Sequence, residues 1–187
     1  MALLRDSLLA GRRIVLAGSA APALGPALAA LRASLEPLAV AELPPEEERV
    51  GEWARSRGPL DALVHDAAGA FGAGDQAGLC AALEEAWAAV REVATGALID
   101  SPTPGRIVLI APPADAGPLA RAAAAGLENL ARTLAVEWAR HGLTAVLVAP
   151  GAHASQAEVG QVVAFLVSEA GGYFSGCRLE LGALAGR

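Results

Sequence analysis

Short runs rich in leucine and β-branched residues alternate with longer helical segments along the chain, and this alternation limits the fold more than any other feature. The runs are short and largely uncharged, as is typical of buried strands. Strands that alternate with helices predict a doubly wound α/β fold, Rossmann-like, with a mostly parallel sheet. We expect a single domain over residues 1–187, with strands at 12–18, 38–41, 62–65, 107–110, 144–151 and 177–181.

Capping residues mark where several helices begin and end. Asp75 is a predicted N-cap for the first long helix, and Ser155–Glu158 matches a capping box before the last helix. Pro118 lies where the first turn of a helix accepts proline, and Gly142 follows the end of the same helix. The acidic segment 44–58 predicts a further, solvated helix.

Charge and cysteine content exclude several classes of protein. The net charge is −6 and no basic run is present, so we expect neither a nucleic-acid nor a membrane partner. Cys80 and Cys177 fit no ligand spacing and no disulfide scaffold, which favours a reducing, cytoplasmic location. The three histidines are scattered, so no metal site is expected. The N-terminus has no signal-peptide pattern, and two glycines and two prolines interrupt the uncharged stretch 14–31.

Four segments together resemble the short-chain dehydrogenases/reductases, in particular members similar to 3-oxoacyl reductases. The segments are LDALVHDAAGAFG, GRIVLIAPP, LENLARTLAVEWARHGLTAVLVAPG and VVAFLVSEAGGYFSGCRLELGA. The resemblance covers nearly the whole chain. It implies a Rossmann-like fold and hydride transfer between a nicotinamide cofactor and a carbonyl or alcohol.

The catalytic positions that this resemblance implies hold side chains without suitable chemistry. With LENL as the anchor, the tyrosine that exchanges the proton falls on Ala120, and the lysine that lowers its pKa falls on Ala124. The serine falls on Ala111 or Pro112, and the asparagine of the preceding helix falls on Val93. Shifting the alignment cannot restore the lysine, because all 14 basic residues are arginine. The resemblance therefore implies a degenerate member with no catalytic residue.

The cofactor-binding positions are incomplete as well. Gly18 matches the first glycine of the phosphate loop and Gly25 matches the third with one extra residue, but Pro22 stands at the second. Proline removes an N–H donor and adds bulk where a pyrophosphate would approach. Asp66 replaces an asparagine, and Glu42 is either a ribose-binding acid or a surface residue. Gly18, Gly25 and Asp66 are thus at most a remnant, and we expect no bound cofactor in this chain.

Compared with the resembled family, this chain lacks some segments and keeps others, and the two groups lie in different parts of the sequence. The chain is short by about one strand–helix unit before residue 60, and few residues follow Gly151 where the resembled family has a substrate-covering segment. The segments 75–100, 118–140 and 155–181, through which family subunits pair, are well formed. The recurring apolar residues of the second segment are candidate interface residues: Leu127, Leu130, Leu134 and Trp138.

Three functions remain open from the sequence. The first is a non-catalytic subunit that pairs with a catalytically complete paralogue, which would carry the NAD(P). The second is an active NAD(P)H-dependent oxidoreductase acting on a keto or hydroxyacyl substrate through unconventional groups such as His65 or Asp66. The third is a stand-alone module that binds a small ligand. The apolar helical faces are equally compatible with a monomer in which they cover only the sheet.

Overall fold

A single six-stranded parallel sheet forms the centre of the molecule. The computed structural model describes residues 4–40 and 51–182. Within these ranges the strand order is β2-β1-β3-β4-β5-β6, and every neighbouring pair is parallel. This confirms the doubly wound α/β fold. The strands are β1 (Arg13–Gly18), β2 (Ser34–Leu38), β3 (Ala62–Asp66), β4 (Arg106–Ile110), β5 (Thr144–Pro150) and β6 (Cys177–Leu181).

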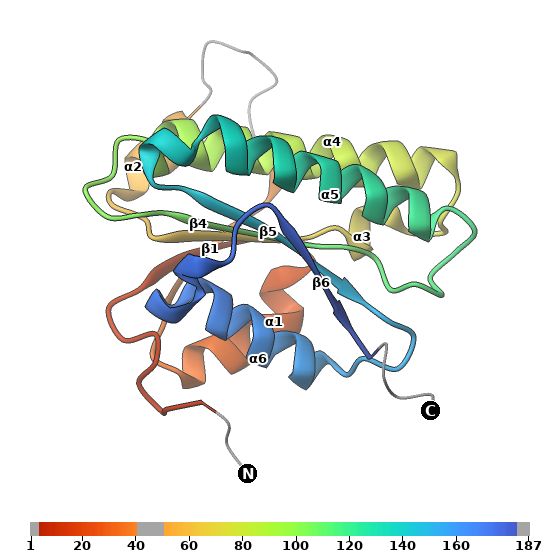
Figure 1. Ribbon diagram of the computed structural model, residues 1–187, viewed down its shortest axis with the longest axis horizontal. Helices are drawn as coiled ribbons and strands as arrows, with labels where there is room; N and C mark the ends of the chain where they lie inside the picture. Colours follow the sequence, from red (N-terminus) through yellow and green to blue (C-terminus); the bar gives the residue numbers. More distant parts are fainter. Residues whose placement is uncertain (1–3, 41–50, 183–187) are drawn as a thin grey trace.

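Helices cover both faces of the sheet. Figure 1 shows α2, α4 and α5 in a layer on one face, and α1 and α6 on the other. Short helical turns, including α3, connect some of the larger elements. The helices are α1 (Ala20–Ala30), α2 (Glu52–Arg57), α3 (Ala68–Phe71), α4 (Gln76–Val93), α5 (Ala120–Glu137) and α6 (Gln156–Val167), with further turns at Ala94–Leu98, Ala139–His141 and Glu169–Tyr173.

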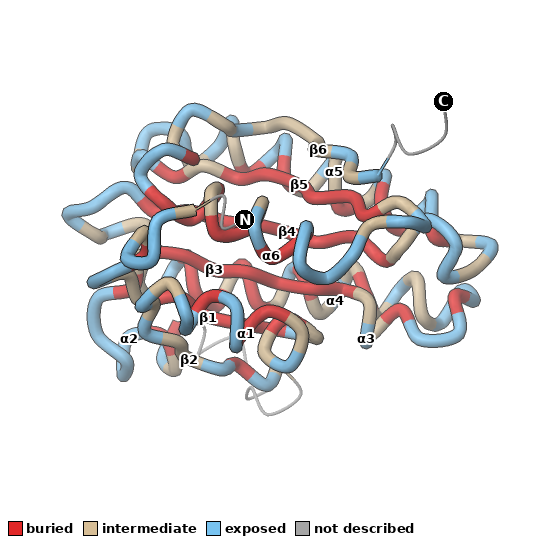
Figure 2. Tube along the Cα trace, turned by 90° about the horizontal axis from the view of Figure 1, so that it is seen from below, coloured by how far each residue is buried: buried red, intermediate tan, exposed pale blue. Residues whose placement is uncertain are grey.

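The apolar core is split into two layers by the sheet. Figure 2 shows that the central strands are buried along nearly their whole length. Alternate residues of each strand point to opposite faces, so Leu63 packs under α4 and α5 whereas Val64 packs under α1 and α6. Strands buried on both faces need continuous apolar runs, which explains sequences such as RIVLI in β4.

Most of the predicted elements are confirmed, and the second strand is a correction. It was expected at 38–41 but lies at Ser34–Leu38, with Pro37 opposite Leu16 of β1. Proline is tolerated there because β2 is an edge strand in the described part of the sheet, and only one of its sides needs ladder hydrogen bonds. The predicted helix at 44–58 begins at Glu52 within the described residues, and its first part, like Glu42, lies outside them.

The predicted caps at Asp75, Ser155 and Gly142 are confirmed, whereas Pro118 lies outside α5, which begins at Ala120 with Leu119 as its N-cap. The Asp75 carboxylate accepts a hydrogen bond from the Gly78 N–H at 2.9 Å. Ser155 and Glu158 form a complete capping box at α6. Gly142 adopts φ +72° after α5 and its terminal turn, as an αL C-cap requires.

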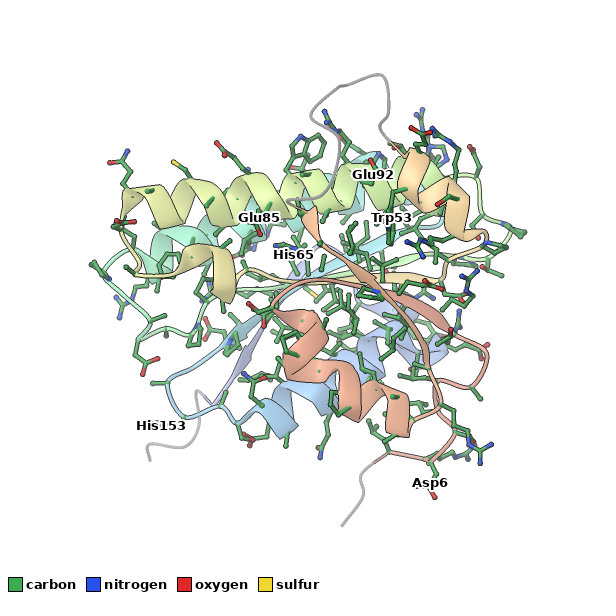
Figure 3. The ribbon with its side chains drawn as sticks, turned by 180° about the vertical axis from the view of Figure 1, so that it is seen from behind. Asp6, Trp53, His65, Glu85, Glu92 and His153 are labelled. Carbon is green, nitrogen blue, oxygen red and sulfur yellow. The ribbon has the colours of Figure 1, made fainter. Side chains whose placement is uncertain are left out.

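A buried carboxylate joins α2 to α4. Glu92 of α4 accepts hydrogen bonds from the Gly51 N–H at 2.7 Å and the Trp53 N–H at 3.0 Å (Figure 3). These N–H groups belong to the first turn of α2, where a carboxylate is favoured by the helix dipole. Gly51 lies against Gly96 of the π-helical turn after α4, and a β-carbon on either glycine would collide with the other's backbone.

The sheet has fewer strands on one side of β1 than a full doubly wound half. Only β2 lies beyond β1 among the described residues, so the predicted absence of one strand holds for that part of the chain. The connection from β5 to α6 is also short, from Gly151 to Ser155. None of the helices described is both long and apolar enough to cross a bilayer.

Candidate functional site

The strand order places a crevice at the carboxyl ends of β1 and β3. The chain leaves β1 toward β2 on one side and later continues from β3 toward β4 on the other. Ligands of doubly wound sheets bind at such a switch point. A pocket of about 340 Å³ lies here, and it is lined by Gly18, Ser19, Leu38, Ala39, Val40, Gly69, Ala70 and Glu85.

The turn from β1 to α1 leaves little room for a phosphate. Only Ser19 separates the strand from the helix, and its N–H donates to the Asp66 carbonyl at 3.0 Å. Gly18 has φ +62°, and a β-carbon there would lie well inside contact distance of the same carbonyl. Pro22, in the first turn of α1, supplies no N–H. The glycine at position 18 is therefore explained by the close approach of β1 to the end of β3.

Gly25 lies in the middle of α1 and is buried against the sheet. A β-carbon at this position would be 3.9 Å from side-chain carbons of Leu16 and Leu35, which is ordinary contact. Because it faces the sheet, Gly25 cannot touch a ligand in the crevice. Its position matches that of a glycine that lets a helix pack closely on a strand.

Replacing Gly25 with alanine is expected to stabilise the protein by about 0.5–1 kcal/mol, because the helix gains propensity and the methyl group has space. Urea denaturation of Gly25→Ala beside the parent protein measures this. A loss of stability would mean that α1 and the sheet cannot accommodate one methyl group.

One carboxylate, Glu85, lines the crevice where phosphate oxygens would need donors, and a second, Asp66, lies next to it as the strand partner of Gly18. Asp66 is nearly buried, and its carboxylate accepts from the Ala68 N–H at 3.0 Å. Burial raises the pKa of Asp66, and this hydrogen bond partly opposes the rise. Glu85 points from α4 toward the sheet and lines the same pocket (Figure 3). With Pro22 and these two acids, the crevice does not fit the pyrophosphate of a dinucleotide.

His65 is fully buried next to this crevice. Neither ring nitrogen has a hydrogen-bond partner among the described residues. Burial lowers the pKa of His65 to about 4, because the charged imidazolium loses its hydration. The imidazole is thus neutral at pH 7, and it lines neither the switch-point pocket nor the pocket described next.

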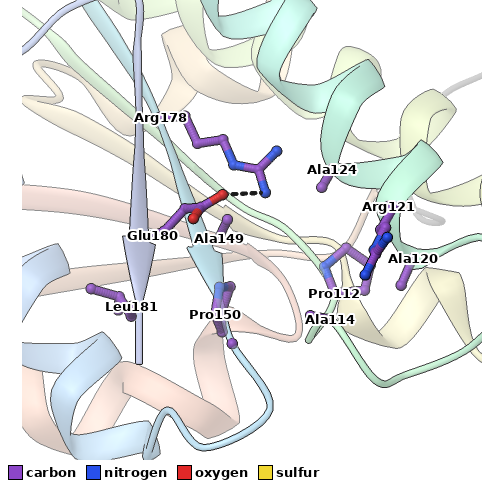
Figure 4. Close-up of a pocket in the computed structure, with 11 residues that line it drawn as sticks. Pro112, Ala114, Ala120, Arg121, Ala124, Ala149, Pro150, Arg178, Glu180 and Leu181 are labelled. Atoms are coloured by element: carbon purple, nitrogen blue, oxygen red, sulfur yellow. Dashed lines mark ion pairs between the residues drawn. The ribbon is translucent and has the colours of Figure 1, made fainter. Parts of the chain in front are cut away.

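A second pocket lies at the carboxyl ends of β4 and β5, and three of the implied catalytic positions line it. Pro112, Ala120 and Ala124 come together there, although they lie on a loop and on α5 (Figure 4). None of these side chains can exchange a proton or hold a carbonyl oxygen. Ala111 is buried beside them, and Val93 is buried in the core of α4.

Sequence reasoning missed the charged groups of this second pocket. Arg178 and Glu180, both on β6, line it and form an ion pair at 2.9 Å, while Arg121 lines it from α5. Arg121 immediately follows Ala120, so its presence could have been noticed. β6 lies beside the pocket because it is the neighbour of β5 in the sheet, and this strand order cannot be read from the sequence.

The predicted interface residues of α5 face this chain's own core. Leu127 and Leu134 are buried among the residues beneath α4 and α5, and Leu130 and Trp138 are partly buried against the same cluster. Residues with this apolar spacing cover the sheet, so Leu127 and Leu134 cannot reach a partner. The large apolar side chains that are exposed on this layer are Trp87 at 44% and Val136 at 79%.

Comparison with known proteins finds the fold but no close sequence relative. No family model matches the sequence, and no curated protein matches it. A citronellol catabolism dehydrogenase of Pseudomonas aeruginosa superposes with TM-score 0.72 at 24% identity, over 95% of this chain and 96% of that one. A hydroxysteroid dehydrogenase from Escherichia coli gives TM-score 0.69 at 17% identity, over 94% and 98% of the two chains. An enoyl-acyl carrier protein reductase of Bacillus cereus, solved with NADP+, gives 0.70 at 16%, over 94% and 96%. The chain has the fold of the short-chain dehydrogenases/reductases.

Proposed function

We propose that this chain is a non-catalytic subunit that pairs with a catalytically complete paralogue in a hetero-oligomeric NAD(P)-dependent dehydrogenase or ketoreductase. The observation that carries the proposal is the pocket formed by Pro112, Ala120 and Ala124. Proton transfer at a carbonyl needs an ionisable or hydroxyl group within hydrogen-bond reach. Methyl groups and a proline ring stand where this fold would need that group.

The crevice supports the same proposal from the side of the cofactor. Glu85, in the wall of the crevice, would repel a pyrophosphate, and Pro22 removes a backbone donor from the first turn of α1. The chain itself therefore binds no dinucleotide, and the NAD(P) belongs to the partner. We also propose a reducing, cytoplasmic location, which the two unpaired cysteines support.

The alternative of an active enzyme with unconventional groups has weaker support. His65 is buried with no partner among the described residues, and the Asp66 carboxylate is engaged with a backbone N–H. Neither residue lines the pocket that holds Ala120 and Ala124. A general base has to reach the proton that it removes, and these two groups do not.

The outer face of the α4 and α5 layer is the surface that we assign to the partner. Trp87 and Val136 are exposed there, and aromatic side chains such as Trp87 are enriched at protein–protein interfaces. The core-facing leucines of α5 fix this helix on the sheet, which leaves its opposite face available for the partner.

Native mass spectrometry of the complex recovered from source cells, with a tag on this chain, tests the proposal. We expect the mass of a complex that contains a second, different subunit. The sequence of that subunit should hold the catalytic tyrosine and lysine, whose positions in this chain are Ala120 and Ala124. A mass showing this chain alone or self-paired would overturn it. So would reduction of a carbonyl by the isolated chain with NAD(P)H at a rate abolished by a point mutation in this chain.

Substitution of the contact surface makes the test specific. Val136→Arg is expected to reduce recovery of the partner at least about tenfold, because a buried unpaired charge is costly in an interface. Ala29→Arg adds the same side chain to an exposed position of α1, on the opposite face of the sheet, and should leave recovery unchanged. Equal recovery with both variants would place the partner elsewhere.

A further inference from the structure

The pocket that lost the catalytic side chains is still an open cavity. Its volume is about 390 Å³, which is in the range of small-molecule sites. Its apolar lining comes from Pro112, Ala120 and Ala124 on one side and from Ala149 and Leu181 on the strands (Figure 4). A cavity with such walls has room for a short hydrocarbon chain.

Two guanidinium groups flank this cavity from different elements. Figure 4 shows Arg121 on α5 at one side and Arg178 on β6 at the other, with Ala124 of α5 near them. Arg121 makes no ion pair and no side-chain hydrogen bond in the ranges 4–40 and 51–182. A cation at the edge of an apolar cavity, without a counter-ion from those ranges, favours an anionic ligand.

Arg178 is held in place by carboxylates yet keeps donor capacity. It contacts Glu180 at 2.9 Å and Glu128 of α5 at 3.4 Å, while Glu128 also pairs with Arg132 at 2.7 Å. The Nε atom of Arg178 is buried without an acceptor in the described structure, so a ligand in the cavity cannot reach it. A guanidinium has five N–H donors, and the terminal nitrogens of Arg178 keep some of theirs beside the two carboxylates.

Among the described residues, the uncompensated charge at the cavity is that of Arg121. Arg178 also lines it, but both Glu180 in the lining and Glu128 beside it pair with Arg178. Guanidinium groups bind carboxylates in a planar, bidentate geometry. An apolar wall beside two such groups fits a molecule with one carboxylate and a short hydrocarbon chain.

We propose that this cavity binds a small aliphatic carboxylate, with its carboxylate between Arg121 and Arg178 and its hydrocarbon chain against Pro112, Ala120, Ala124 and Leu181. The site is a binding site and performs no reaction. It lies in this chain alone and needs no partner subunit, so it stands or falls separately from the proposed function.

Calorimetric titration of the purified chain with hexanoate tests the site. Hexanoate is expected to bind with a Kd of the order of 1 mM, as a ligand of this size allows. Hexanamide, which has the same shape without the charge, should bind at least about tenfold more weakly. Binding of hexanoate should also weaken with added salt.

Arginine variants locate the binding in this pocket. Arg121→Gln is expected to weaken hexanoate binding about tenfold or more, whereas Arg5→Gln, at an exposed position outside the pocket, should leave it unchanged. Circular dichroism of each variant verifies folding. The proposal is overturned if hexanoate does not bind up to about 10 mM, if hexanamide binds equally well, or if Arg121→Gln binds as the parent does.

Discussion

Replacing Gly18 with alanine is expected to destabilise the protein by at least about 3 kcal/mol. Two effects add up: a non-glycine residue at φ +62° costs about 1–2 kcal/mol, and the new β-carbon would collide with the Asp66 carbonyl. That carbonyl also accepts the Ser19 N–H, so its movement would disturb the joint between β1, α1 and β3. Urea denaturation of Gly18→Ala measures the loss.

Gly11 provides a matched control because it has φ +81°, yet a β-carbon added there would have no neighbouring atom within 4 Å. Gly11→Ala should therefore lower the free energy of unfolding only by the backbone cost of about 1–2 kcal/mol. Equal losses for the two variants would show that the collision at Gly18 is relieved cheaply. The comparison also bears on function, because it tests whether a glycine at the first position of a phosphate loop is required here by packing alone.

The sequence correctly predicted those helices and strands whose ends depend on residues only a few positions apart. The Asp75 cap and the Ser155–Glu158 capping box depend on contacts three residues apart, which the sequence displays directly. The strand pattern of β4 is equally local, because burial on both faces requires an uninterrupted apolar run.

Features that depend on distant residues were missed or misplaced. The second strand was predicted at 38–41, but β2 lies at Ser34–Leu38 and includes Pro37, which an edge strand of this sheet order accepts. The apolar spacing of α5 predicted a buried face correctly, but not whether this chain or a partner buries it. Leu127 shows that the answer is this chain's own sheet.

The sequence predicted that the candidate site lacks the catalytic side chains, but it did not predict which charged residues line the site. Ala120 and Ala124 could be placed by resemblance, and the structure gathers them with Pro112 in one pocket. Arg178 enters that pocket only because β6 lies beside β5 in the sheet. Glu85 reaches the switch point from the middle of α4, and no motif signals this.

Acidification from pH 7 to pH 4 is expected to remove about 3 kcal/mol of stability through His65. The pKa of His65 in the folded protein is lowered to about 4 by burial, from an ordinary value of 6.5. Between these values the unfolded chain binds the proton and the folded chain does not, so stability falls as the pH falls through this window. Asp66 acts in the opposite direction, because burial raises its pKa and its protonation favours the folded state.

The contribution of His65 is isolated by comparing the parent protein with His65→Leu across this pH range. The leucine side chain cannot titrate, and it replaces a buried ring whose nitrogens have no partner among the described residues. The difference in unfolding free energy between the two proteins, from urea denaturation, should change by about 3 kcal/mol between pH 7 and pH 4 and be flat above pH 7. A constant difference would mean that His65 finds a proton acceptor or water in the folded protein. Because Asp66 and the other acids are present in both proteins, their titration cancels, and the remaining slope belongs to the histidine beside the switch-point crevice.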